Sequence, residues 1–154
     1  MDSNVVNSDA APFVTDGELE SHLGWEAFRS MALNKKREAV VDCSSTPRPF
    51  DAGSILVLST LLADRLRGET SQKRVGIVLP PGIGAIIANL ATVFIGKSPV
   101  NLNFSLGSEA LKHSIDQAEI DLVLTAEAVQ KRLPDFPWPS RILDVSAELK
   151  QFSK

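Results

Sequence analysis

The stretch Val75–Leu102, VGIVLPPGIGAIIANLATVFIGKSPVNL, decides the fold class. Its first five residues form an uninterrupted apolar run, as expected of a strand that is covered on both faces. Prolines and glycines follow, and residues 83–95 are apolar nearly all round, which predicts a buried helix. Residues 99–102 then predict a second short strand. This strand–helix–strand order indicates a βαβ unit and a parallel sheet.

Further strands and helices alternate on both sides of this unit. The patterns predict strands at 38–42, 121–125 and 141–145, and helices at about 19–32, 54–67, 108–118 and 127–133. Gly68 is placed to end the second helix and Ser108 to cap the third. Residues 43–51 and 134–139 are rich in proline and predict loops. We therefore expect an α/β fold, a layered, mostly parallel sheet with helices on both faces.

The length and composition of the chain predict one domain with a short N-terminal tail. Residues 1–14 are polar and aperiodic, which predicts a disordered tail, and residues 15–154 form a single α/β subdomain that begins with a capping box at Thr15–Glu18. The net charge of -3 gives no general attraction to nucleic acid. The single cysteine, Cys43, excludes an internal disulfide and fits a reducing, cytoplasmic compartment.

An uncharged run from residue 75 to residue 96 approaches the length of a membrane span. Pro80, Pro81 and two glycines near its start would break a lone helix in lipid, where freed backbone groups have no partner. A buried strand, a turn and a buried helix explain the same run, so we expect no transmembrane segment.

Two glycine motifs suggest phosphate binding. Gly96-Lys97-Ser98 could end a phosphate loop, but Ala91 stands where that loop needs glycine, and a helix precedes the motif where a strand is required. We therefore expect Gly96 to end a helix. Gly82 and Gly84 follow a strand and precede a helix, yet the third glycine of the dinucleotide fingerprint is absent. This leaves a small nucleotide-binding protein as a minor alternative.

Other chemistry is sparse. Cys43, His113 and Asp116 have the residue types that a thiol catalytic set would need, but nothing in the sequence brings them together. No metal-ligand spacing and no hydrolase motif is present. The residues alone therefore predict no catalytic residue and no metal site.

Several stretches resemble the N-terminal part of adenylate-forming enzymes, the AMP-dependent synthetases and ligases. The resemblance covers about residues 26–146. Within the family, the amino-acid sequence is most similar to the AMP-ligase domain of the acyl-carrier-protein synthetase/lysophospholipid acyltransferase group. The stretches that carry it are Arg74–Pro80, Gly96–Ser105, Glu109–Leu111 and Ala118–Thr125.

The resemblance implies an AMP-forming acyl (fatty acid) synthetase. In that reaction a carboxylate attacks the α-phosphate of ATP, and a thiol on coenzyme A or an acyl carrier protein then displaces AMP. The family's phosphate loop, its acidic residue for ribose and Mg²⁺, and its mobile lysine all lie after the matched region. We therefore expect this chain to need the remainder of the synthetase, C-terminal to Lys154, as its partner and to be inactive alone. For the parent enzyme, association with a membrane is left open.

The resemblance also implies three residues near the thiol cofactor. Asn103 lies in the loop after the second strand of the βαβ unit, and Lys131 and Arg132 end a short helix. The two cations could bind phosphates of coenzyme A or a pantetheine arm. The alternative is a capping role for Asn103 and a solvated helix end for the two cations.

A second hypothesis competes with the synthetase subdomain. The chain could be a stand-alone, non-catalytic α/β module that keeps the fold for binding or interaction. This hypothesis predicts an exposed apolar face that a partner covers.

Overall fold

The computed structural model describes residues 22–152. A four-stranded sheet has the order β4-β3-β5-β6. It consists of β3 (Arg74–Ile77), β4 (Ser98–Asn101), β5 (Leu122–Thr125) and β6 (Arg141–Asp144), and every pair is parallel. These strands lie where the apolar runs predict them, within one or two residues. The expected α/β fold is confirmed.

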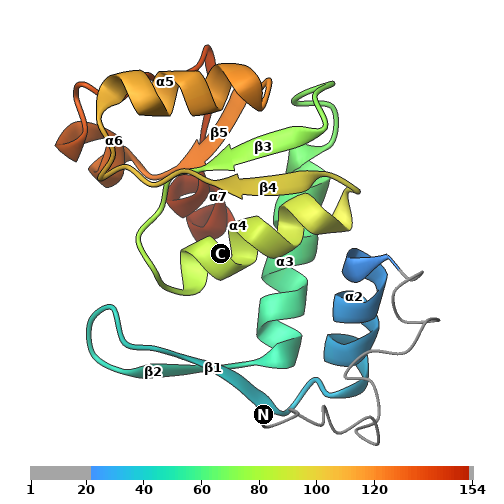
Figure 1. Ribbon diagram of the computed structural model, residues 1–154. Coiled ribbons are helices and arrows are strands. Elements are labelled where there is room, and N and C mark those ends of the chain that lie inside the picture. The colour runs from blue at the N-terminus through green and yellow to red at the C-terminus, as the bar shows by residue number, and fades with distance from the viewer. Residues whose placement is uncertain (1–21, 153–154) are drawn as a thin grey trace, which may run out of the picture.

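Helices cover both faces of this sheet (Figure 1). On one side lie α3 (Ala52–Leu66), α4 (Ile83–Phe94) and α7 (Val145–Gln151); on the other lie α5 (Ser108–Gln117) and α6 (Glu127–Arg132). The two central strands are apolar on both faces because each face packs on helices. The buried core on the first face includes Leu62, Leu66, Val75, Ile77, Ile87, Ala88, Ala91, Leu122, Leu124 and Leu143. The core on the second face is built from Val78, Leu102, Leu111, Ile115, Ile120, Val123 and Phe136.

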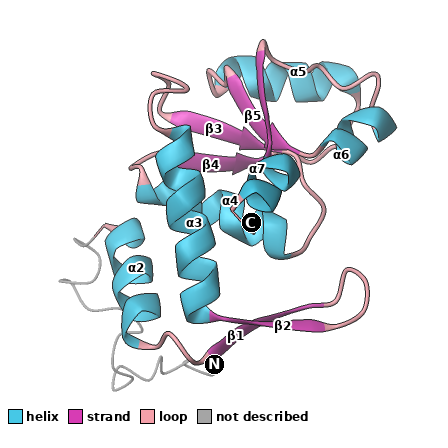
Figure 2. Cartoon of the chain, turned by 180° about the vertical axis from the view of Figure 1, so that it is seen from behind, coloured by secondary structure: helices cyan, strands magenta, loops and turns pink. Residues whose placement is uncertain are grey.

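A helix and a hairpin precede the sheet. They are α2 (Leu23–Leu33) and the antiparallel pair β1 (Glu38–Asp42) and β2 (Arg48–Asp51). Figure 2 shows the hairpin at the end of α3 that lies away from the parallel sheet, with α2 alongside α3. The predicted loop at 43–51 is therefore wrong in its second half. Pro49 argued against a strand at this position in the sequence. In a two-stranded ribbon, however, both strands are edge strands, where proline is tolerated.

Other element ends also differ from expectation. Helix α7 was not predicted, and Ser108 is the first residue of α5 rather than its cap, since Gly107 holds the cap position without a side-chain bond. The described part of the first helix begins at Leu23, with His22 as its cap. The predicted tail at 1–14 and the capping box at Thr15–Glu18 lie outside the described residues. Within residues 22–152, no helix is long and apolar enough to span a membrane.

Candidate functional site

The carboxyl edge of the parallel sheet is the natural place to look for a ligand site. Strand β4 pairs on one side of β3 and β5 on the other, so the order in which strands are added to the sheet reverses between β3 and β5. Open α/β sheets bind ligands at such a switch point. Here the buried Thr125 hydroxyl donates to the Val78 carbonyl at 2.7 Å, and the Val78 amide donates to the Leu124 carbonyl at 2.9 Å. The chain thus satisfies these polar groups itself.

A carboxylate lies at the adjoining N-terminus of α4. The Ile83 amide donates to Asp42 Oδ2 at 3.1 Å, and the Ser44 amide donates to Oδ1 at 2.9 Å. The backbone bond from Ser44, then the one from Ile83, lower the pKa of Asp42. Gly82 has a φ of +154°, and a Cβ there would lie 3.4 Å from Oδ1. Asp42 therefore holds the place that a bound phosphate would take, and the dinucleotide alternative gains no support.

The Gly96-Lys97-Ser98 motif is a helix end, as expected. Gly96 follows α4 with a φ of +74°, and its amide donates to the Val93 carbonyl at 2.9 Å. The Lys97 ammonium donates to the Gln72 carbonyl at 2.6 Å. A lysine engaged in this way supports the turn and does not face a phosphate site.

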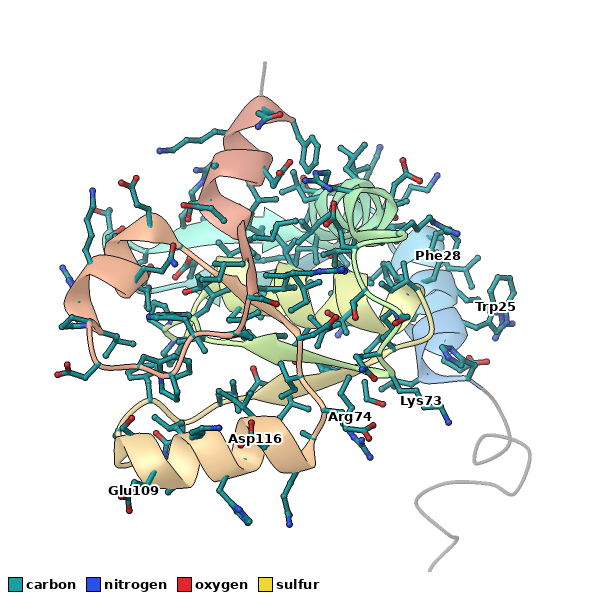
Figure 3. The ribbon with its side chains drawn as sticks, turned by 90° about the horizontal axis from the view of Figure 1, so that it is seen from above. Trp25, Phe28, Lys73, Arg74, Glu109 and Asp116 are labelled. Carbon is teal, nitrogen blue, oxygen red and sulfur yellow. The ribbon has the colours of Figure 1, made fainter. Side chains whose placement is uncertain are left out.

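The residues considered as a thiol catalytic set, Cys43, His113 and Asp116, do not lie together. Cys43 is exposed in the β1–β2 connection, whereas His113 and Asp116 lie on α5, across the parallel sheet from α2 and α3. Figure 3 shows Asp116 on that helix, far from Trp25 of α2. Asp116 pairs with Lys112 at 2.7 Å on the exposed face of α5. Among residues 22–152, no group of three or more metal-ligating side chains gathers.

The three residues implied for the thiol cofactor lie in the β4–α5 loop and at the end of α6, and their contacts differ. Asn103 Oδ1 accepts from the Ser105 amide at 3.1 Å and from the Ser105 hydroxyl at 2.8 Å, which closes the β4–α5 loop. Lys131 pairs with Glu127 one turn earlier on α6, at 2.6 Å. Both of these residues thus have local partners.

Arg132 is placed differently. It borders a small pocket of about 180 Å³, together with Phe104 and Leu106 of the β4–α5 loop and Phe136 of the proline-rich loop. The fold therefore places Arg132 beside the loop that contains Asn103, although Asn103 itself does not line this pocket. Within the described part of the chain the Arg132 guanidinium forms no ion pair. It remains available for an anion at this pocket, whose lining also includes the acidic Asp135.

Asp144 is a site residue that sequence reasoning missed. Its Oδ2 accepts from the Glu127 amide at 2.8 Å, and its Oδ1 accepts from the Ala147 amide at 2.9 Å. One carboxylate therefore caps both α6 and α7, and it positions α6, which carries Arg132. The available signal was an aspartate at a strand end directly before Val-Ser-Ala-Glu, a sequence able to begin a helix.

The described residues do not fit ATP and Mg²⁺. The α4 N-terminus already faces the Asp42 carboxylate, Lys97 is bonded to Gln72, and no acidic cluster is available for a metal in this part of the chain. A nucleotide phosphate at α4 would meet like charge.

The fold and this edge define a class: an α/β subdomain of the kind found in adenylate-forming enzymes. The model of the AMP-binding enzyme family matches residues 29–151, which is most of the chain, so the chain belongs to that family. A search of curated proteins found no match.

Solved structures show the same fold at low identity. O-Succinylbenzoate coenzyme A synthetase from Bacillus subtilis, in complex with ATP and magnesium ion, has a TM-score of 0.67 and 18% identity over 80% of this chain and 33% of its own. The N-terminal subdomain of NpsA from Klebsiella oxytoca has 0.67 and 15%, over 81% of this chain and 31% of that one. The nonribosomal peptide synthetase FmoA3 has 0.72 and 17%, over 84% and 14%. This chain thus spans about a third or less of each of these structures.

Proposed function

We propose that this chain is the first part of the N-terminal subdomain of an AMP-forming acyl synthetase, an enzyme that activates a carboxylate with ATP and transfers the acyl group to a thiol. The observation that carries the proposal is the family match over residues 29–151. The substrate class, a fatty acid, rests on the resemblance of the Val75–Leu111 stretch to acyl-carrier-protein synthetases. The acceptor is coenzyme A or an acyl carrier protein.

In this proposal the ATP site belongs to the remainder of the enzyme. The solved relatives are about three to seven times as long as the part that this chain covers, and the relative from B. subtilis was solved with ATP and magnesium. The described residues offer no cradle for a nucleotide, since Asp42 caps α4. In this proposal the chain contributes part of the folded scaffold of the enzyme. It also forms one wall of the path along which the thiol acceptor enters, which we call the thiol path.

The pocket beside Arg132 is our candidate for that wall. Its lining combines apolar side chains with Ser108, Asp135 and Arg132. The arginine is exposed and without an ion pair in the described chain. A pantetheine arm has a slender body and a phosphate at one end, so an apolar groove with a cation at its rim matches it. Lys131, held by Glu127, would contribute less.

The test compares Arg132→Gln with Lys131→Gln in the protein that carries this chain together with its C-terminal remainder. Thioester formation and carboxylate-dependent ATP–pyrophosphate exchange are measured separately. A charge-assisted bond to phosphate contributes about 1.5–3 kcal/mol, so Arg132→Gln should raise the KM for the thiol roughly 10- to 150-fold. Exchange should not change in either variant.

Two results would count against this site. An unchanged KM for the thiol in Arg132→Gln would remove the pocket from the thiol path. Equal losses in both half-reactions would indicate a general structural defect. Absence of exchange in the parent protein, with a panel of carboxylic acids, would contradict the proposed function itself.

A further inference from the structure

The β1–β2 hairpin, residues 38–51, has little packing against the rest of the fold. We call this hairpin the ribbon. None of its strand residues is buried, and neither hydrophobic core includes a side chain from it. A two-stranded hairpin alone in water is marginally stable at best. The position of the ribbon therefore depends on the bonds that join it to its neighbours.

The side of the ribbon that faces α3 is not closely packed. A cavity of about 550 Å³ lies between β2 and the first two turns of α3, and Val57 in its lining is 57% exposed. Close packing makes a protein interior rigid, because each atom then has partners on every side. The ribbon lacks this support along α3.

Hydrogen bonds hold the ribbon at two places. At its base, the Ser54 amide of α3 donates to Asp51 Oδ1 at 2.7 Å. At the far end of β1, Asp42 Oδ2 accepts from the Ile83 amide of α4 at 3.1 Å. Among residues 22–152, this is the only hydrogen bond between the ribbon and the rest of the fold away from that base. Figure 1 shows the ribbon extending from the start of α3 toward the side of the molecule where α4 begins.

The local backbone suits the contact between the ribbon and α4. Gly82, which precedes Ile83, has a φ of +154°, and a Cβ there would lie 3.4 Å from Asp42 Oδ1. The Ser44 amide donates to the same oxygen at 2.9 Å, so the turn of the ribbon orients the carboxylate. The backbone bond from Ser44, then the one from Ile83, lower the pKa of Asp42, which keeps the carboxylate charged at neutral pH. A charged acceptor binds an amide more strongly than a neutral one.

We propose that the ribbon is a flap at the carboxyl edge of the parallel sheet and that Asp42 holds it closed. When the carboxylate is lost, the ribbon moves as one unit about its base at α3, while the parallel sheet and its helices stay folded. Opening uncovers the first turn of α4, which follows the carboxyl end of β3. The inference is independent of the proposed enzymatic function, because it concerns only the contacts of the ribbon with α3 and α4.

Hydrogen–deuterium exchange of the whole chain, followed by mass spectrometry of its peptides, tests the proposal with Asp42→Ala. Local opening exposes the amides of the unit that opens and leaves the others protected. Loss of one typical hydrogen bond changes an opening equilibrium roughly 2- to 12-fold, so exchange in residues 38–51 should become faster by that factor. Exchange in the central strands β3 and β5 should keep the rate of the parent chain.

The matched control is Glu38→Ala. It removes an exposed carboxylate from the same strand, at the end of β1 that pairs with Asp51 beside the base. The change in net charge is therefore the same as in Asp42→Ala, but the contact with α4 is kept. We expect the exchange of residues 38–51 in this control to match that of the parent chain.

Three outcomes would overturn the proposal. Unchanged exchange of residues 38–51 in Asp42→Ala would show that Asp42 does not hold the ribbon. Equal acceleration in the ribbon and in β3 and β5 would show that the chain opens as a whole. Acceleration in Glu38→Ala as large as in Asp42→Ala would assign the effect to the loss of charge on β1 instead of the contact with Ile83.

Discussion

Asp144 provides the sharpest test of how the carboxyl edge of the sheet is held together. Its two carboxylate oxygens accept from the first turns of two helices, at 2.8 Å from the Glu127 amide and at 2.9 Å from the Ala147 amide. Loss of one helix cap costs about 0.5–2 kcal/mol. Asp144→Ala should therefore lower the free energy of unfolding by about 1–4 kcal/mol.

Asp144→Asn separates the two caps. The amide side chain keeps one acceptor oxygen and loses the other, so its cost should be about half of the alanine value. A chain of this length loses about 2–4 °C in Tm per kcal/mol, which predicts a drop of roughly 2–16 °C for Asp144→Ala. Urea unfolding followed by circular dichroism gives the free energies, and calorimetry gives the Tm.

The control is Asp116→Ala, which removes a carboxylate from an exposed pair with Lys112. Such pairs contribute about 0–1 kcal/mol, so this variant should unfold close to the parent chain. If Asp144→Ala matched Asp116→Ala within 0.5 kcal/mol, roughly the spread of ordinary surface changes, the double cap would be refuted. An asparagine variant as unstable as the alanine variant would refute the separation of the two caps.

Other predictions concern stability and pH. Gly76→Ala should lower stability by about 1–3 kcal/mol because its Cβ would lie 2.8 Å from a side-chain carbon of β5; an unchanged urea midpoint would contradict this close packing. Gly84→Ala, inside α4 with nothing within 4 Å, should raise stability by about 0.5–1 kcal/mol; a loss would indicate an unrecognised constraint there. Asp42 has a lowered pKa in the folded chain, so its contribution is present above the ordinary value of 3.8 and disappears as the pH falls through the lower folded value. The unfolding midpoint of the parent chain should thus fall more steeply below pH 3.8 than that of Asp42→Ala, and parallel pH profiles would contradict this.

The elements that sequence patterns predicted well are those decided by local chemistry. The apolar run at Val75 and the all-apolar helix after it admit one buried strand and one buried helix, and the structure has both. Gly96 ended its helix as expected because a left-handed C-terminal residue favours glycine. By contrast, β2 contains Pro49 and lies in an exposed ribbon, so neither propensity nor alternation marked it.

The site depends on contacts that span long stretches of chain, and these were harder to foresee. Asp42 meets the Ile83 amide across 41 residues, and Asp144 meets the Glu127 amide across 17. No local pattern encodes such a contact, since it depends on the order of strands in the sheet. Arg132 and the loop after Asn103 were named together only through the family resemblance, and the structure places Arg132 beside Phe104 of that loop.

ATP–pyrophosphate exchange in the presence of carboxylic acids tests the central claim most directly. We predict exchange by the protein that carries this chain with its C-terminal remainder, fastest with a fatty acid, and none above background by residues 1–154 alone. The described residues place the Asp42 carboxylate, rather than a phosphate site, at the α4 N-terminus. Carboxylate-dependent exchange by residues 1–154 alone, retained after rigorous purification, would contradict the account.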